Sequence, residues 1–422
     1  MKAVVYTLGC KVNDVESGSL ISGLEEMGYE VTGELCPADL IIINTCAVTA
    51  EAERKSRQLV GRAMKISPDA DVVVCGCASQ KNSRAFLEKG ARVRLVTGAK
   101  SKGKILEEIR KGLSGQKIAL DENVGDKYED MPLPKCLKTR NFVKIQDGCN
   151  RFCAYCIIPY LRGRSRSRNM DDVVAEVKQS AARETVLTGI DVSAYRDEQG
   201  RGMTELLIAL RDVDARIRIG SMEVGLITDD FLAAAKSMKN FAPHFHLSLQ
   251  SGSDKVLRSM NRHYTRTEYL DACRKIYATF ENASITTDII VGFPTETEED
   301  FSDSLRIVEE ASFSQIHAFP YSPREGTNAY KRYRELPAAV KKDRMERLIA
   351  VGKAQKEKYL QRFIGKRLIM VPEQFIDGYT EGYSENYLRL YLGEKIEKMP
   401  LTVAIDCSGG NIFRDGRKKY KR

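Results

Sequence analysis

Long apolar segments are missing from this 422-residue sequence, in which apolar runs such as Leu40–Ile43 and Val72–Cys75 have only the length of a strand. A helix that spans a bilayer needs about 20 consecutive apolar residues. The N-terminus also lacks the charged, apolar and small-residue segments that make up a secretion signal. These absences predict a cytoplasmic protein without a membrane partner.

Histidine is scarce as well. The four histidines, His244, His246, His263 and His317, have no finger-type spacing with cysteine, which argues against structural zinc. Eleven cysteines in a cytoplasmic protein do not indicate disulfides, because that compartment keeps thiols reduced. They indicate metal binding, catalysis or buried filler. The net charge of +9 mildly favours a polyanionic partner.

Residues 1–115 alternate short apolar runs with segments of helical length. The expected strands are Ala3–Leu8, Leu40–Asn44, Val72–Cys75 and Arg92–Thr97, and the expected helices are Asp14–Met27, Glu51–Ile66 and Lys102–Lys111. Near-continuous apolar strands that alternate with helices predict an α/β domain whose parallel sheet is covered on both faces.

A second α/β series follows a proline-containing linker at 121–139. Its expected strands are Phe142–Gln146, Thr185–Thr188, Arg216–Gly220, His244–Leu249, Ile285–Val291 and Ile316–Pro320. Its expected helices are Asp171–Arg183, Thr204–Val213, Asp229–Lys239, Arg266–Phe280 and Glu298–Ala311. Six repeats within residues 136–365 predict a partial (βα)6 barrel, whose chemistry belongs at the carboxyl ends of the strands.

The C-terminal part changes character. Residues 330–367 are helical in pattern and contain thirteen basic residues against four acidic ones. Residues 366–422 then carry short apolar runs at Arg367–Val371, Tyr387–Leu392 and Leu401–Ile405, followed by a basic tail. This pattern predicts a small β module.

Three cysteines of the first domain each follow a predicted strand. Cys10, Cys46 and Cys77 lie just beyond its first three strands. Because the carboxyl ends of parallel strands meet at one edge, we expect these thiols to lie close together. Each cysteine alone could equally be a small buried hydrophobe; three in equivalent places favour a site.

Cys149, Cys153 and Cys156 follow the first predicted barrel strand with the spacing C-x3-C-x2-C. Three closely spaced thiolates suit an iron–sulfur cubane and leave one iron open to a further ligand. A redox-active C-x-x-C pair is the alternative, which the third cysteine disfavours. The spacing predicts a radical enzyme that uses S-adenosylmethionine at the open iron.

Other polar residues lie near this predicted site. We expect the strand-end residues Glu223, Gln250, Ser251 and Asp288 to hold S-adenosylmethionine. Arginines alternate directly after the cysteine loop, and on an extended segment they would point one way and form a phosphate track; they are Arg162, Arg164, Arg166 and Arg168. A solvated loop is the alternative for the arginines.

Several motifs resemble the methylthiotransferase family of radical S-adenosylmethionine enzymes along nearly the whole chain. They include T-L-G-C-K-V-N (7–13), I-N-T-C-A-V-T (43–49), G-C-A-S-Q (76–80), Q-D-G-C-N-R-F-C-A-Y-C (146–156), H-L-S-L-Q-S-G-S (246–253), M-N-R-H-Y-T (260–265) and F-P-Y-S-P-R-E-G-T (319–327). Ser193 and Thr295 stand where the family often has glycine. The C-terminal module resembles the family's small RNA-binding β-barrel (TRAM) domain only weakly.

The resemblance implies two 4Fe–4S clusters: a radical cluster at Cys149, Cys153 and Cys156, and an auxiliary cluster at Cys10, Cys46 and Cys77. It divides the chain into a methylthiotransferase domain (1–115), a radical core (136–365) and a β-barrel module (366–422). The form L-G-C-K-V-N (8–13) is most similar to the branch that methylthiolates C2 of N6-threonylcarbamoyladenosine at position 37 of tRNA.

The sequence leaves other functions open. Sister branches act on isopentenyladenosine in tRNA or on an aspartate of a ribosomal protein. A non-catalytic iron–sulfur or sulfur carrier is a candidate of another class, although it would not need the polar strand ends. The sequence indicates neither the sulfur source, nor the electron donor, nor the oligomeric state.

Overall fold

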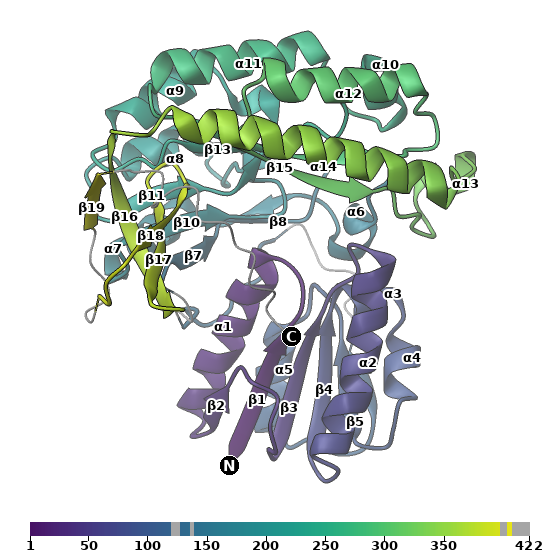
Figure 1. Cartoon of the computed structure of the whole chain (residues 1–422). Coiled ribbons are helices and arrows are strands. Elements are labelled where there is room, and N and C mark those ends of the chain that lie inside the picture. The colour runs from purple at the N-terminus through teal and green to yellow at the C-terminus, as the bar shows by residue number, and fades with distance from the viewer. Residues whose placement is uncertain (120–126, 136–138, 397–402, 407–422) are drawn as a thin grey trace.

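The computed structural model describes residues 1–119, 127–135, 139–396 and the backbone of 403–406. An N-terminal α/β domain lies beneath a half-open barrel, and a small antiparallel sheet lies at one end of the barrel (Figure 1). This architecture confirms the α/β fold class that the sequence predicts.

The N-terminal sheet is entirely parallel, with the order β2-β1-β3-β4-β5-β6. Its strands are β1 (Lys2–Thr7), β2 (Glu30–Thr32), β3 (Leu40–Thr45), β4 (Asp71–Gly76), β5 (Val93–Thr97) and β6 (Lys117–Ala119). Its helices are α1 (Lys11–Glu26), α2 (Ala50–Ile66), α3 (Cys77–Lys81), α4 (Ser83–Leu87) and α5 (Gly103–Arg110). The sequence misses β2, β6, α3 and α4, because three-residue edge strands and single-turn helices are too short to show a period.

The barrel contains two parallel sheets, β11-β10-β7 and β12-β13-β14-β15. Its strands are β7 (Asn141–Lys144), β10 (Glu184–Thr188), β11 (Arg216–Ile219), β12 (Ser221–Met222), β13 (His244–Leu247), β14 (Ser284–Val291) and β15 (Gln315–Pro320). The predicted strand Arg216–Gly220 ends one residue earlier, and β12 follows Gly220, where an added Cβ would lie 3.1 Å from the carbonyl oxygen of Leu187. The chain therefore pairs with β10 before this glycine and with β13 after it.

Helices cover the outer face of the barrel (Figure 1). They are α7 (Met170–Gln179), α8 (Met203–Ala209), α9 (Asp229–Ser237), α10 (Asp254–Ser259), α11 (Arg266–Thr279) and α12 (Glu298–Glu310). Threonines cap several of them: Thr265 and Thr297 each accept a backbone N–H and form capping boxes with Glu268 and Asp300. After α13 (Asn328–Arg332), the basic segment forms α14 (Ala338–Gln361), which packs on α12 and β15. None of the helices in the described ranges has the length and apolar character needed to cross a bilayer.

The C-terminal module is an antiparallel sheet with the order β18-β17-β16-β19. Its strands are β16 (Arg367–Ile376), β17 (Tyr379–Ser384), β18 (Arg389–Leu392) and β19 (Val403–Asp406). The sequence misses β17 because it is polar and contains Gly382, which lies closely against β16 at the bulge after Pro372. The basic tail lies outside the described residues.

The described part of the predicted linker is bound to both large domains. The Tyr128 hydroxyl donates to the carbonyl oxygen of Lys144 at 3.0 Å, and the backbone N–H of Gly103 donates to Glu129 at 2.7 Å. Burial raises the pKa of Glu129 to about 7. This segment therefore contributes to the contact between the domains.

A buried ion cluster joins the N-terminal domain to the barrel. Arg162 ends the short helix α6 (Ile158–Arg162), is fully buried, and donates to Glu16 of α1 at 2.9 Å and to Asp147 at 3.0 Å. Asp147 lies in the two-stranded ladder of β8 (Gln146–Asp147) and β9 (Arg166–Ser167). Three more cations complete the cluster: Lys102, Lys144 and Arg166.

Replacing Glu16 by glutamine should lower the free energy of unfolding by about 3–5 kcal/mol, because it leaves buried cations without their shared carboxylate. Urea denaturation of the purified protein measures the change. The control is Asp271→Asn, which breaks an exposed pair with Arg274 and should cost less than about 1 kcal/mol. Equal midpoints for the two variants would contradict this role of Glu16.

Candidate functional site

Cys10, Cys46 and Cys77 lie at one edge of the N-terminal sheet, as their strand-end positions predict. They follow the neighbouring strands β1, β3 and β4, and the charges of the three thiols influence one another. Gly9 has a φ of +113°, and a Cβ there would lie 3.0 Å from the sulfur of Cys46. Only glycine lets the Cys10 loop approach Cys46 this closely.

Asn13 holds the loop of Cys10 in place. Its side-chain amide donates to the carbonyl oxygens of Leu8 at 2.7 Å and Thr45 at 3.2 Å. Its side-chain oxygen accepts from Arg162 at 2.8 Å. The hexapeptide at 8–13 is therefore fixed both to β3 and to the buried ion cluster.

Cys75 and Cys77 are only two residues apart but belong to different cores. Cys75 is inside β4 and packs with the core on the α1 and α5 face, whereas Cys77 begins α3 and packs with Ile157 and Leu161 of the barrel. Burial raises the pKa of the Cys75 thiol to about 12. Cys75 is thus core filler, and Cys77 lies with the predicted ligands.

The loop of Cys149, Cys153 and Cys156 is shaped by its backbone. The N–H of Cys149 donates to the carbonyl oxygen of Gly163 at 3.1 Å, and Ala154 bonds to Met260 and Ala329 through its N–H and carbonyl. Phe152, between the first two cysteines, has a φ of +48°, a conformation that bulky residues rarely adopt. Such strain persists only where surrounding contacts hold it, and it is typical of functional loops.

The chemistry of both thiol sets fits iron–sulfur clusters. Burial raises the pKa of Cys46 and Cys149 to about 11 and that of Cys156 to about 12. These thiols therefore need a strong positive charge to ionise, which iron supplies when thiolates bind it. Within the described residues, no three Cys, His, Asp or Glu side chains could hold one metal ion. A cubane spreads its thiolates further apart, because each binds a different iron.

The two thiol sets are linked through α3 and α6. Helix α3 begins at Cys77 and packs on α6, which begins two residues after Cys156. Arg162 lies beside Cys77, and its Nε has no hydrogen-bond partner although the side chain is fully buried. Its cluster holds four cations against two carboxylates, Glu16 and Asp147. These positive charges would stabilise the negative charge of thiolates bound in an iron–sulfur cluster.

Arg262 is a site residue that the sequence analysis misses. It donates to the sulfur of Cys153 at 3.4 Å and to both carboxylate oxygens of Glu223 at 2.6 and 2.7 Å. The backbone N–H of Glu223 donates to the Ser193 hydroxyl at 2.8 Å, so the serine at this glycine position anchors Glu223. The motif M-N-R-H-Y-T (260–265) contained the signal for Arg262.

The other residues expected to hold S-adenosylmethionine come from the segment after β13 and from β14. Gln250 has a φ of +68° and exchanges backbone hydrogen bonds with Asp288 and Ile290 of β14. The Asp288 carboxylate lies 3.3 Å from Nε2 of His246. Ser251 is fully buried, and its hydroxyl lies against Ser304 of α12 and accepts from the N–H of Ser253. The expectation for Ser251 is therefore corrected: its hydroxyl docks the loop on α12.

The predicted arginine track is not formed. Arg162 and Arg166 are buried in the ion cluster, and Arg168 is paired with Glu176 of α7. Only Arg164 is exposed, with its guanidinium 4.7 Å from the centre of the Phe152 ring. The segment is a helix end, a turn and a short strand rather than one extended strand, so its arginines do not share a face.

Comparisons with known proteins agree with this arrangement. Profiles of the Radical SAM superfamily and of Uncharacterized protein family UPF0004 match residues 143–308 and 2–98. The radical S-adenosylmethionine methyltransferase TsrM from Kitasatospora setae superposes with a TM-score of 0.57 at 12% identity, covering 84% of this chain and 89% of that chain. The cobalamin-dependent radical enzyme OxsB superposes with a TM-score of 0.53 at 10% identity, over 85% of this chain and 56% of that chain. The fold and the cysteine loop therefore define a radical S-adenosylmethionine enzyme, a class that implies S-adenosylmethionine and a 4Fe–4S cluster.

Sequence relatives identify the family of radical S-adenosylmethionine enzymes to which this chain belongs. The chain is 38% identical to threonylcarbamoyladenosine tRNA methylthiotransferase MtaB of Chlamydia pneumoniae, over 87% of this chain and 86% of the relative. It is 36% identical to MtaB of Aquifex aeolicus over 90% and 98%, and 35% identical to tRNA-2-methylthio-N(6)-dimethylallyladenosine synthase of Oceanobacillus iheyensis over 90% and 77%. The chain belongs to the methylthiotransferase family of radical S-adenosylmethionine enzymes.

Replacing Cys77 by alanine should remove about half of the iron and sulfide from anaerobically reconstituted protein, because one of the two expected four-iron clusters would be lost. Replacing Cys75, on the other face of the sheet, should leave the iron content unchanged. Iron and sulfide assays on both variants measure the difference. Equal iron contents would contradict an auxiliary cluster at Cys77.

Proposed function

We propose that this enzyme methylthiolates C2 of N6-threonylcarbamoyladenosine at position 37 of tRNA, with two 4Fe–4S clusters. The observation that carries the reaction type is the contact of α3 with α6, which links the set Cys10, Cys46 and Cys77 to the set Cys149, Cys153 and Cys156. Two sets of thiols on packed elements suit a reaction in which one site activates a C–H bond and the other delivers sulfur.

The cofactors would supply the difficult chemistry: S-adenosylmethionine at the radical cluster yields a 5′-deoxyadenosyl radical, and the auxiliary cluster carries the sulfur. The protein positions the reactants and excludes water. Glu223, held beside Cys153 by Arg262, is suited to the ammonium group of S-adenosylmethionine. Gln250 and Asp288, which are joined by a backbone hydrogen bond, are proposed as further polar contacts.

The choice of substrate rests on sequence. The MtaB relatives, at 38% and 36% identity, are named for threonylcarbamoyladenosine, and L-G-C-K-V-N (8–13) is most similar to that branch. The relative at 35% identity is named for dimethylallyladenosine, which makes isopentenyladenosine in tRNA the second candidate. A tRNA substrate also favours a cytoplasmic location.

Contact with tRNA is proposed for Arg164, which lies exposed beside the cysteine loop. The target adenine must leave its stack to reach the thiols, which a single-stranded anticodon loop permits at low cost. The basic helix α14 offers fewer free positive charges to tRNA than its composition suggests. Arg344 pairs with Glu296, Arg347 pairs with Glu298, and Lys358 pairs with Glu309.

The two cysteine sets should separate the two half-reactions. Replacing Cys153 by alanine should abolish formation of 5′-deoxyadenosine, because the radical cluster is lost. Replacing Cys46 by alanine should retain part of that formation and stop methylthiolation. Chromatography of reconstituted reactions measures both products. Methylthiolation by Cys46→Ala would contradict the role of the auxiliary site.

The substrate can be tested in cells. Deleting the gene should remove the methylthio form of threonylcarbamoyladenosine from tRNA, and the wild-type gene, but not Cys153→Ala, should restore it. Mass spectrometry of tRNA nucleosides measures this change. Unchanged levels, with loss of methylthio-isopentenyladenosine instead, would reject the proposed substrate in favour of the second candidate.

A further inference from the structure

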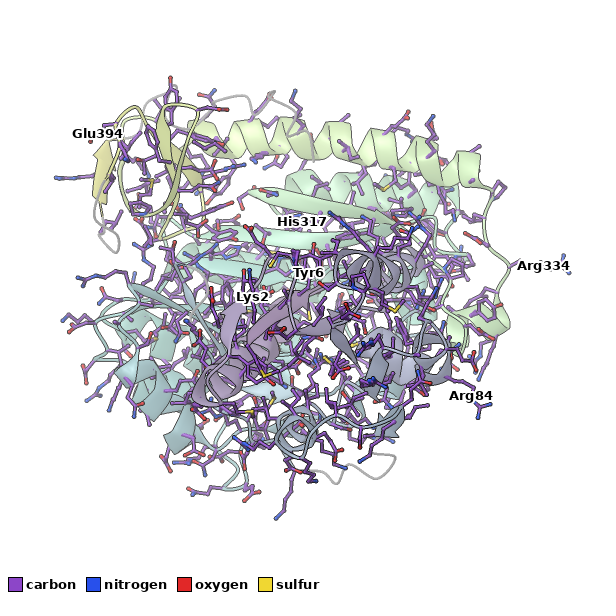
Figure 2. The ribbon with its side chains drawn as sticks, turned by 90° about the horizontal axis from the view of Figure 1, so that it is seen from below. Lys2, Tyr6, Arg84, His317, Arg334 and Glu394 are labelled. Atoms are coloured by element: carbon purple, nitrogen blue, oxygen red, sulfur yellow. The ribbon has the colours of Figure 1, made fainter. Side chains whose placement is uncertain are left out.

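A cavity of about 590 Å³ lies between the barrel strands and the C-terminal module, within the size range of ligand pockets. Its barrel wall includes Arg218 of β11, His244 and His246 of β13 and His317 of β15, and its other wall includes Tyr387. Seen from below, His317 lies on strands between the module, marked by Glu394, and Arg334 at the opposite end (Figure 2). Lys11, directly after Cys10, also lines this cavity.

Most charged side chains that line the cavity are basic. They are Lys11, Arg218, Lys353, Lys356 and Arg389, with the carboxylate of Glu357, and Arg218 and Arg389 are also paired with Glu184 and Glu381 outside the lining. The Lys11 side chain is exposed and, within the described ranges, makes no hydrogen bond or ion pair. This part of the enzyme is therefore suited to bind an anion.

Arg218 belongs to a cluster of arginines and carboxylates beside the cavity. The guanidinium groups of Arg140, Arg216 and Arg218 share Glu184 and Glu373, and Glu385 adds a negative charge near Arg216. Arg218 is 2% exposed and bonds to Glu184 through Nε and Nη2, whereas its Nη1 is buried without a partner. A buried donor left unpaired is costly, and Arg218 lines the cavity, so its unpaired Nη1 indicates a ligand there.

An aromatic wall faces the same space. The rings of His244 and Tyr387 stack at 4.5 Å, and those of Tyr387 and Tyr383 at 4.6 Å. Tyr387 has a φ of +65°, which a bulky residue adopts only under strain. Ser384 and Asn386 hold its turn: Ser384 donates to the Asn386 side chain, which donates to the carbonyl oxygen of Asn282 at 2.9 Å. The module thus fixes one ring of the cavity wall.

We propose that this cavity binds the carboxylate of the N6-substituent on the target adenine, with Arg218 Nη1 and Lys11 as its cationic partners. The proposal rests on the proposed function and names the residues that select its substrate. Because Lys11 follows Cys10, the cavity adjoins the loop that would deliver sulfur to C2. His244 Nδ1, buried without a partner, adds a polar contact.

An uncharged isopentenyl group would leave these cations unpaired, and sites built for a polar group reject analogues that lack it. A backbone phosphate is the other anion that this chemistry could bind. The position beside the Cys10 loop favours the carboxylate, since an inserted base would carry its substituent there. The two sources are separated by capping the carboxylate while keeping every phosphate.

The test uses the reconstituted enzyme and three anticodon stem–loop RNAs, whose target adenines carry threonylcarbamoyl, its methyl ester or isopentenyl. Arg218→Met leaves Arg140 and Arg216 with the two carboxylates of their cluster, so we expect it to fold. It should lower the ratio of kcat/KM on the free carboxylate to kcat/KM on the ester by about 10- to 100-fold, the loss of one charge-assisted hydrogen bond. Lys11→Met, with its iron content verified, should shift the ratio in the same direction.

The matched control is Lys342→Met, an exposed lysine of α14 outside the cavity, which should leave the ratio unchanged. An equal loss on all three RNAs by Arg218→Met and Lys11→Met would indicate a phosphate contact and overturn the proposal. A wild-type enzyme active only on the isopentenyl RNA would instead reject the proposed function. Formation of 5′-deoxyadenosine by Arg218→Met verifies that its radical site is intact.

Discussion

The structure depends on one buried guanidinium, that of Arg162. It bonds to α1 through Glu16, to the first barrel ladder through Asp147, and to the Cys10 loop through Asn13. A charge removed from water must keep all its partners, because losing one leaves an uncompensated ion. The positions of α1, α6 and the two thiol sets are therefore mutually constrained, and a shift in one would break hydrogen bonds to the others.

The sequence predicts those parts of the fold that depend on local pattern. Strands β3 and β4 are buried on both faces, so they appear in the sequence as unbroken apolar runs. The thiols after them lie together because parallel strands end at one edge of the sheet. The roles of Arg162 and Arg166 could not be predicted, since the decisive carboxylate of Glu16 is 146 residues from Arg162. The burial of Ser251 could not be predicted for a similar reason, because its partner Ser304 belongs to a helix and lies 53 residues later in the chain.

The C-terminal module is docked on the barrel as part of its wall. Arg216 of β11 donates to the carbonyl oxygen of Ile369 at 2.9 Å, and Ser284 of β14 donates to that of Asn386 at 2.5 Å. These bonds join the first residues of two barrel strands to β16 and to the turn that carries Tyr387. A role for the module in shaping the substrate cavity follows from these contacts and does not require it to bind RNA by itself.

Two ion clusters in this protein hold an arginine with a buried nitrogen that has no hydrogen-bond partner. One is Arg162 beside Cys77, and the other is Arg218 beside the cavity. An unpaired buried donor lowers stability, so its retention calls for a partner anion. Thiolates bound in an auxiliary cluster would lie beside the first arginine, and the carboxylate of an N6-substituent would pair with the second. The unpaired donors thus mark both where sulfur would be held and where its acceptor would be recognised.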